Sequence, residues 1–188
     1  MNIRELLAAG LLVGIALTLS AQQPVAPAAK AGDNAPSLAT TMHFIQDKLN
    51  GIGKASYSTQ TANGRWQFYT NEISNVAADQ DQCNIFYHLK ETLGGKAYKD
   101  ENKVLSLKDN QQIVWKPFFQ YLTELDAKAG RPYIRPNTST ATLFVVVLQR
   151  QQGEDDFFLF KDYDLPERVS NALTHAAKLC GGGNKDPF

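Results

Sequence analysis

The side chains that most often carry out catalysis or bind metals are few in this chain and widely spaced. It contains three histidines and two cysteines: His43, His88, His175, Cys83 and Cys180. A zinc site usually takes pairs of His or Cys a few residues apart, and no such pair occurs. A Cys-x-x-Cys redox motif, a Gly-x-Ser-x-Gly nucleophile elbow, a phosphate loop and a dinucleotide fingerprint are also missing. The sequence therefore predicts no catalytic residue, no metal ligand and no cofactor.

An enzyme would have to assemble its site from distant segments. His88 and His175 are the candidate general bases of this alternative, a small exported hydrolase or metal-dependent enzyme, because both fall on the polar faces of the elements predicted below. Each histidine would need an Asp or Glu brought within hydrogen-bond reach by the fold.

Aromatic residues are the more informative group, with 10 Phe, 7 Tyr and 2 Trp. This number exceeds what one thin core layer needs, so some rings could form an exposed patch for a peptide or protein partner. The candidate patch is Trp115, Phe118, Phe119 and Tyr121. The alternative is that these rings pack the sheets against the helices.

The N-terminus predicts export. A weakly basic start is followed by an apolar run over residues 6–19 and by Ser20-Ala21, which is the layout of a signal peptide cleaved near Ala21. The apolar run has 14 residues, fewer than the roughly 20 needed to span a bilayer, so we expect no transmembrane span in the mature chain. Residues 22–36 are Ala/Pro-rich and predict a flexible linker. We expect a periplasmic or extracellular location.

An oxidising compartment favours a disulfide between Cys83 and Cys180. The alternative is two separate buried thiols, because free cysteine is a common core residue.

Composition limits the number of domains and the class of partner. The 188 residues, 43% of them hydrophobic, predict a single globular domain over residues 37–181 with a flexible tail at 182–188. Basic and acidic residues balance at 19 each. We expect no nucleic-acid partner, since binding of that kind depends on an excess of positive charge.

Three helices are predicted from apolar residues at helical spacing. The first has Leu38, Met42, Ile45, Leu49 and Ile52 on one stripe, with Ser37 as its N-cap. The last carries a stripe that runs from Leu165 to Cys180, and Asp164 with Glu167 forms a predicted capping box. A shorter helix over 118–129 ends before Gly130.

About seven strands are predicted between these helices, from residues of alternating character and from turn signals such as Asn63-Gly64. On one strand, Cys83 shares its inward face with Ile85, Tyr87 and Leu89, while His88 lies on the opposite face. The predicted strands cover residues 55–61, 65–73, 83–90, 103–107, 111–115, 142–149 and 156–161. The strands at 142–149 and 156–161 are apolar on both faces, so we expect both of their faces to be covered.

Sequential antiparallel strands predict an α+β fold that is mainly β. We expect curled antiparallel sheets, or a partly open barrel, closed by the C-terminal helix, with an additional N-terminal helix. The segments FFLFKDYDLPERVSNALTHAAKLC and KVLSLKDNQQIVWK resemble the pleckstrin-homology-like fold. The first of these segments, together with CNIFYHLKE, also resembles an uncharacterised family of exported bacterial proteins with such a domain. The alternative fold is a cone-shaped helix-plus-curved-sheet of the nuclear-transport-factor type.

The resemblance implies a fold and no activity. The favoured hypothesis is an exported, non-enzymatic interaction module whose partner is a protein or peptide of the cell envelope.

Overall fold

The structure is a computed structural model that describes residues 35–61, 63–128, 130, 135–136, 142–150 and 152–182. The predicted signal peptide, nearly all of the predicted linker and most of the predicted tail lie outside these residues. The described elements, in chain order, are α1 (Leu38–Ile52), β1 (Lys54–Gln60), β2 (Trp66–Asp79), β3 (Asn84–Leu93), β4 (Lys96–Ser106), η1 (Leu107–Asp109), β5 (Asn110–Pro117), α2 (Phe118–Lys128), β6 (Arg135–Pro136), β7 (Phe144–Arg150), β8 (Asp156–Phe160) and α4 (Asp164–Leu179). No helix among them is long and apolar enough to cross a membrane.

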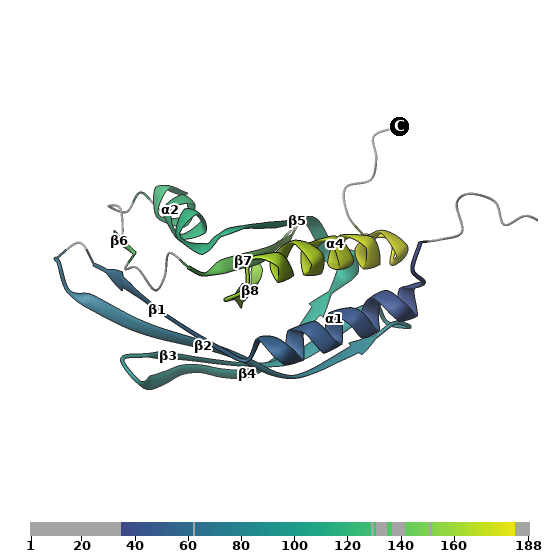
Figure 1. The fold of residues 1–188 in the computed structure, drawn as a ribbon, viewed down its shortest axis with the longest axis horizontal. Coiled ribbons are helices and arrows are strands. Elements are labelled where there is room, and N and C mark those ends of the chain that lie inside the picture. The colour runs from purple at the N-terminus through teal and green to yellow at the C-terminus, as the bar shows by residue number, and fades with distance from the viewer. Residues whose placement is uncertain are drawn as a thin grey trace, which may run out of the picture. The chain divides into compact units, whose positions relative to one another are not determined.

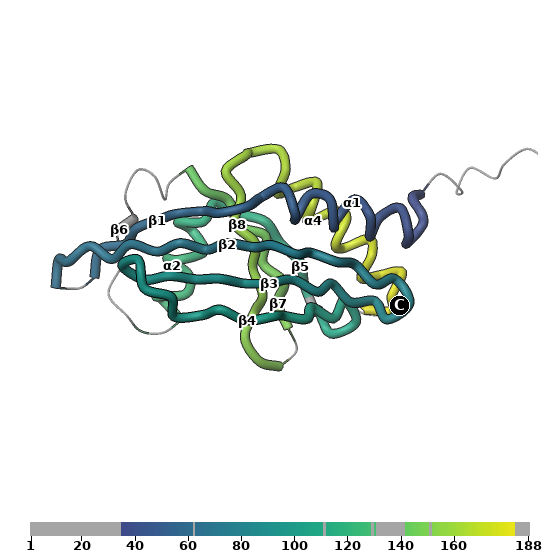
Figure 2. The backbone as a smooth tube through the Cα atoms, turned by 90° about the horizontal axis from the view of Figure 1, so that it is seen from below, coloured from purple at the N-terminus to yellow at the C-terminus, as the bar shows by residue number. Residues whose placement is uncertain are grey.

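The described strands form two antiparallel sheets, which confirms the predicted α+β, mainly β fold. The first sheet has the order β4-β3-β2-β1-β6 and the second has the order β5-β7-β8. Figure 2 shows the strands of the second sheet crossing those of the first. Helices α1 and α4 lie side by side at one end of the first sheet, and α2 lies at the other end (Figure 1). Each sheet keeps two edges in the described residues, so the strands do not close into a barrel.

Helix α1 forms as the sequence predicts. The Ser37 side chain accepts a hydrogen bond from the Thr40 amide at 3.2 Å and so caps the first turn. Met42, Ile45 and Leu49 are buried on the predicted stripe.

Helix α1 also occupies the place of a strand beside β2. Strand β1 pairs with β2 only as far as Glu72, so the rest of β2 lacks a strand on that side. The Asn50 side chain instead donates to the Val76 carbonyl at 3.0 Å and accepts from the Val76 amide at 2.9 Å. Gln46 Oε1 accepts from the Ala78 amide at 2.8 Å. These two amide side chains satisfy backbone groups that would otherwise be unpaired.

Helix α4 has the predicted apolar stripe, with Val169, Leu173 and Ala176 fully buried. The predicted capping box is wrong. Asp164 is the first helical residue, and its amide donates to Asp162 Oδ1 at 2.9 Å. The Asp162 carboxylate thus forms a turn with the backbone two residues on. Tyr163 is at the N-cap position, so the helix begins one residue before the start that an Asp164 N-cap predicts.

Three strands run further than their sequences indicate. Strand β4 begins at Lys96 rather than at residue 103, β2 continues to Asp79, and β3 continues to Leu93. The extra residues of β3 and β4 are mostly polar, so they carry no clear alternating pattern. In β2 a register shift between Ser74 and Ala77 interrupts the alternation. The cross-strand pairing continues through all three extensions. Between the predicted strands at 103–107 and 111–115 lies the 3-10 turn η1, which is followed directly by β5.

The sequence predicts that both faces of the strand pair now seen as β7 and β8 are covered, and β7 confirms this. Val146 and Leu148 belong to one core cluster, with residues of α1, α4 and the first sheet. Val145 and Val147 belong to a second cluster, with Phe118 and Tyr121 of α2.

The predicted disulfide is confirmed. Cys83 and Cys180 are bonded, with their Cα atoms 5.9 Å apart, and Cys83 is buried as predicted. The bond joins the turn before β3 to the end of α4. Gly182 packs there against η1: a Cβ at this position would overlap the Leu107 carbonyl oxygen and lie 2.9 Å from the Lys108 Cα.

Candidate ligand-binding pocket

A pocket of about 600 Å³ lies between the first sheet and α2. Its walls come from β1, β2, β3, β4, α2 and β8, and it is called the tyrosine pocket below. The described lining residues are Tyr57, Thr59, Tyr69, Glu91, Tyr98, Lys99, Phe118, Tyr121, Leu122, Leu125, Asp126, Lys128 and Phe157. A volume of this size is within the range of sites for small organic ligands.

Aromatic rings build the apolar wall. Tyr57 on β1 and Tyr69 on β2 are cross-strand partners, and their rings stack with centroids 5.0 Å apart. Phe118, at the start of α2, meets Tyr57 edge-on at 4.8 Å. Tyr121 lies one helical turn further on and contacts Phe157 of β8. The rings thus fix α2 against both sheets.

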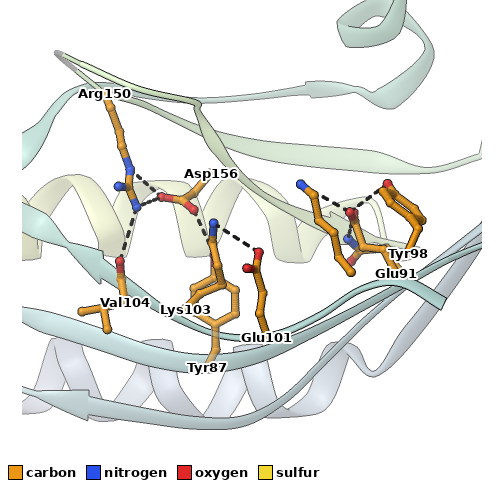
Figure 3. Close-up of polar contacts among 10 residues, drawn as sticks. Tyr87, Glu91, Tyr98, Glu101, Lys103, Val104, Arg150 and Asp156 are labelled. Atoms are coloured by element: carbon orange, nitrogen blue, oxygen red, sulfur yellow. Dashed lines mark hydrogen bonds and ion pairs between the residues drawn. The ribbon is translucent and has the colours of Figure 1, made fainter.

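Glu91 is a buried carboxylate in the wall of the pocket. Asn71 Nδ2 donates to its Oε1 at 2.9 Å, and the Tyr98 hydroxyl donates to its Oε2 at 2.8 Å. Lys99 Nζ lies 3.7 Å from Oε2. Figure 3 shows Glu91 with the Tyr98 hydroxyl directed at its carboxylate. Glu91 therefore has donors on both oxygens, which offset the cost of burying its charge.

A β-bulge brings Tyr98 to this carboxylate. Glu91 pairs with Lys99 and Thr92 pairs with Ala97, so Tyr98 is the extra residue on β4. At a bulge the regular alternation of faces is interrupted. Tyr98 and Lys99 can therefore both reach Glu91, although they are adjacent in the sequence.

Three phenols of the pocket, those of Tyr57, Tyr98 and Tyr121, stay neutral at ordinary pH. Burial, reinforced by the negative charge of Glu91, holds the pKa of Tyr57 well above its usual value. Burial and the hydrogen bond to Glu91 raise the pKa of Tyr98. Burial, with the charges of Asp155 and Glu124, raises the pKa of Tyr121 to about 12. Each hydroxyl therefore keeps its proton and can donate it in a hydrogen bond.

Asp126 is the exceptional residue of the pocket. Its relative exposure is 6%, and its Oδ2 atom is buried without a hydrogen-bond partner. Within the described part of the chain, only one other buried side-chain oxygen, Asn110 Oδ1, lacks a partner in this way. Burying a carboxylate oxygen without a donor is costly, and natural proteins keep such groups mainly where function requires them.

Asp156, a third buried carboxylate, has hydrogen-bond donors on both of its oxygens, unlike Asp126. Asp156 accepts from the Tyr87 hydroxyl at 3.0 Å and from Arg150 Nε at 2.7 Å, and Arg150 Nη2 makes a further bond to it. Arg150 also donates to the Val104 carbonyl at 3.3 Å (Figure 3). The hollow beside this network is only about 50 Å³, so we interpret the network as structural.

The four aromatic residues predicted from sequence do not form one exposed patch. Phe118 is 1% exposed and Tyr121 is 8% exposed, because both rings pack in the core beneath α2. Trp115 is partly buried against Phe144 and Tyr163, and Phe119 alone is well exposed. Phe118 and Tyr121 instead contribute to the tyrosine pocket.

The histidines lie apart from the tyrosine pocket. His88 is on the outer face of the first sheet, where its Nε2 lies 3.0 Å from Asp100 Oδ1 and its Nδ1 lies 3.1 Å from Asn102 Oδ1. His175 lines a largely apolar groove of about 340 Å³ between α1 and α4, and its Nε2 lies 2.9 Å from the Pro36 carbonyl oxygen. His43 is exposed on α1. A search of the described residues for metal sites finds no cluster of three or more His, Cys, Asp or Glu.

Comparisons with protein-family models, with curated proteins and with solved structures find no match.

Sequence reasoning missed Tyr57, Glu91, Tyr98 and Asp126 as site residues. The one available signal was the large number of aromatic residues in the sequence. Besides Tyr121, three of these line the pocket: Tyr57, Tyr69 and Tyr98.

Proposed function

We propose that this protein is an exported, non-enzymatic binding module and that the tyrosine pocket is its ligand site. The observation that carries the proposal is the unpartnered oxygen of Asp126 in the wall of a pocket lined with rings. A binding site needs an apolar body that holds the ligand and a few polar groups that orient it. This pocket supplies both.

Two observations support export. The chain begins with a signal-peptide layout, and Cys83 and Cys180 form a disulfide, a bond that is typical of proteins from oxidising compartments. Membership of a family of exported bacterial proteins with a pleckstrin-homology-like domain is part of the same proposal, supported by the order of strands ahead of a closing helix.

Exposed apolar residues on α2 support the proposal that a partner from the cell envelope binds beside the tyrosine pocket. The large hydrophobic residues Phe119 and Leu125 of α2 are exposed at 40% and 39%, and Leu125 lines the pocket. A ligand in the pocket would therefore lie against α2.

A fragment screen tests the proposal with two matched variants. Leu125→Trp places a larger side chain at the tyrosine pocket, and Asn171→Trp does the same at the groove between α1 and α4. Both positions are exposed on helices, so both variants should fold. We expect saturation-transfer NMR to detect fragments that bind the wild type and the Asn171→Trp variant but not the Leu125→Trp variant. Fragment binding that survives Leu125→Trp and disappears in Asn171→Trp would move the site to the groove and overturn the proposal.

A further inference from the structure

The tyrosine pocket has an unequal distribution of charge between its interior and its rim. Both of its buried charged side chains, Glu91 and Asp126, are carboxylates. Both of its cationic side chains are partly or fully exposed to solvent: the side chain of Lys99 is 39% exposed, and Lys128 is exposed. A solvated lysine is screened by water more strongly than a buried carboxylate. The interior of the pocket is therefore negative.

The two carboxylates differ in the number of hydrogen-bond donors that the protein already supplies to them. Glu91 already receives hydrogen bonds from Asn71 and Tyr98 and an ion pair from Lys99. Asp126 Oδ2 has no donor at all. A ligand that presents an N–H group next to Asp126 would supply the missing hydrogen bond, and a positively charged N–H group would also neutralise the buried charge.

The rings around these carboxylates favour the same kind of ligand. The pocket is lined by the rings of Tyr57, Tyr69, Tyr98, Phe118, Tyr121 and Phe157. Aromatic faces attract cations through the ring quadrupole and bury apolar groups at the same time. An anionic ligand would meet two buried carboxylates and no buried cation.

We infer that the tyrosine pocket binds a small organic cation, an amine attached to an aromatic or aliphatic body, with its ammonium group hydrogen-bonded to Asp126. This inference rests on the proposed function, because it names the ligand class of the same site. The ammonium group takes the place of the missing donor, and the body of the ligand lies among the rings and beside Leu122.

Three probes test whether the charge of the ligand decides its affinity: 2-phenylethylamine, 2-phenylethanol and 3-phenylpropionate. All three carry a phenyl ring on a chain of similar length and differ in the charge of the end group. Their affinities are measured by NMR titration at pH 7. We expect the amine to bind about tenfold more tightly than the alcohol or better, the gain typical of a hydrogen bond to a charged group. We expect the carboxylate to bind most weakly.

Two variants assign the preference to one residue. Asp126→Asn removes the charge and keeps the size of the side chain, and Asp47→Asn makes the same change at an exposed position of α1. We expect Asp126→Asn to abolish the preference for the amine over the alcohol and Asp47→Asn to leave it unchanged. Because Asp126→Asn removes an unpaired buried charge, its melting temperature should equal or exceed that of the wild type, which also verifies folding.

Failure of the inference is distinct from failure of the proposed function. If the alcohol or the carboxylate binds as tightly as the amine, or if Asp126→Asn keeps the preference, the cation inference is overturned while the pocket remains a binding site. If neither these probes nor any library fragment binds at the tyrosine pocket, the proposed function is overturned as well.

Discussion

The two ends of the first sheet use the same strands for different purposes. The inward face of β3 carries Ile85, Tyr87 and Leu89 and then the polar residue Glu91. On β2, which runs antiparallel to β3, the same change occurs between Ile73 and Asn71. Under α1 and α4 these faces are apolar and closed, which we call the closed end. Toward α2 they become polar and open into the tyrosine pocket, which we call the pocket end. On each strand, the last apolar residue of the closed end and the first polar residue of the pocket end are only two positions apart.

Groups that stabilise the fold gather at the closed end. The disulfide, the largest core cluster and the Ser37 cap of α1 are all there. The pocket end instead contains a buried, unpaired carboxylate oxygen on Asp126. Proteins retain destabilising groups chiefly where function requires them, so this difference separates the scaffold from the site.

The largest expected effect comes from removing the disulfide at the closed end. The bond joins residues 97 positions apart, and a loop of that size corresponds to about 4–5 kcal/mol in the chain-entropy model. We expect the Cys83→Ser/Cys180→Ser double variant to lose about 2–5 kcal/mol in urea unfolding. Reducing agent should destabilise the wild type and leave the double variant unaffected. A loss below about 1 kcal/mol would mean that the closed end does not depend on this crosslink.

A pair of leucines compares the packing of the two ends. Leu173 of α4 is fully buried in the closed end, and Leu122 of α2 is partly buried beside the pocket. Truncation of a buried leucine to alanine costs about 2–5 kcal/mol, and the cost falls where the site is already open. We expect Leu173→Ala to lose about 3 kcal/mol and Leu122→Ala less than half of that, by denaturant unfolding. Equal losses would contradict the distinction between the ends.

Two buried aspartates sharpen the comparison further. Asp156 and Asp126 are 5% and 6% exposed, but Asp156 is paired with Arg150 and Tyr87 whereas Asp126 Oδ2 has no partner. We expect Asp156→Asn to destabilise the protein by about 2 kcal/mol, because Arg150 loses its ion pair. Asp126→Asn should raise the unfolding free energy by about 1 kcal/mol. The same sign for both variants would remove the argument that Asp126 is kept for binding.

The smallest effect belongs to an ion pair at the outside of the pocket end. Lys116 Nζ lies 2.6 Å from Glu124 Oε2, and this hydrogen bond lowers the pKa of Glu124. A lowered carboxyl pKa stabilises the folded state above the unfolded pKa of about 4.3, and that contribution is lost as the pH falls through the folded value. Because Glu124 is 40% exposed, we expect Glu124→Gln to cost no more than about 0.5 kcal/mol at pH 7. At pH 2 the variant and the wild type should have equal stability, measured by thermal unfolding at both pH values.

The closed end could be predicted from the sequence because its signals are local or pairwise. The apolar stripe of α1, the face shared by Cys83 and Ile85, and the pairing of two cysteines each follow from residue types and spacing. The start of α4 was misplaced by one residue because Asp164 is a typical N-cap residue by type, whereas in the structure Tyr163 is at the N-cap position and Asp164 is already helical.

The pocket end could not be predicted in the same way. Its lining residues come from six elements, and Tyr98 reaches Glu91 only because of a bulge in a strand with no apolar pattern. The state of Asp126 depends on what surrounds it in space, and its neighbours in sequence, Leu125 and Ala127, give no sign that it is buried. Residue type also misleads on β2, where the apolar residues Trp66 and Phe68 are 45% and 62% exposed rather than buried.

Amide hydrogen exchange with and without 2-phenylethylamine tests the division between scaffold and site most directly. Without the amine, we expect the amides of α4 and β7 to exchange only through global unfolding, and those of α2 to exchange faster through local opening. Bound amine should slow exchange in α2 and around Tyr57, with little change in α4. Uniform exchange rates across α2 and α4, or protection that appears between α1 and α4 instead, would contradict the assignment of the pocket end as the binding site.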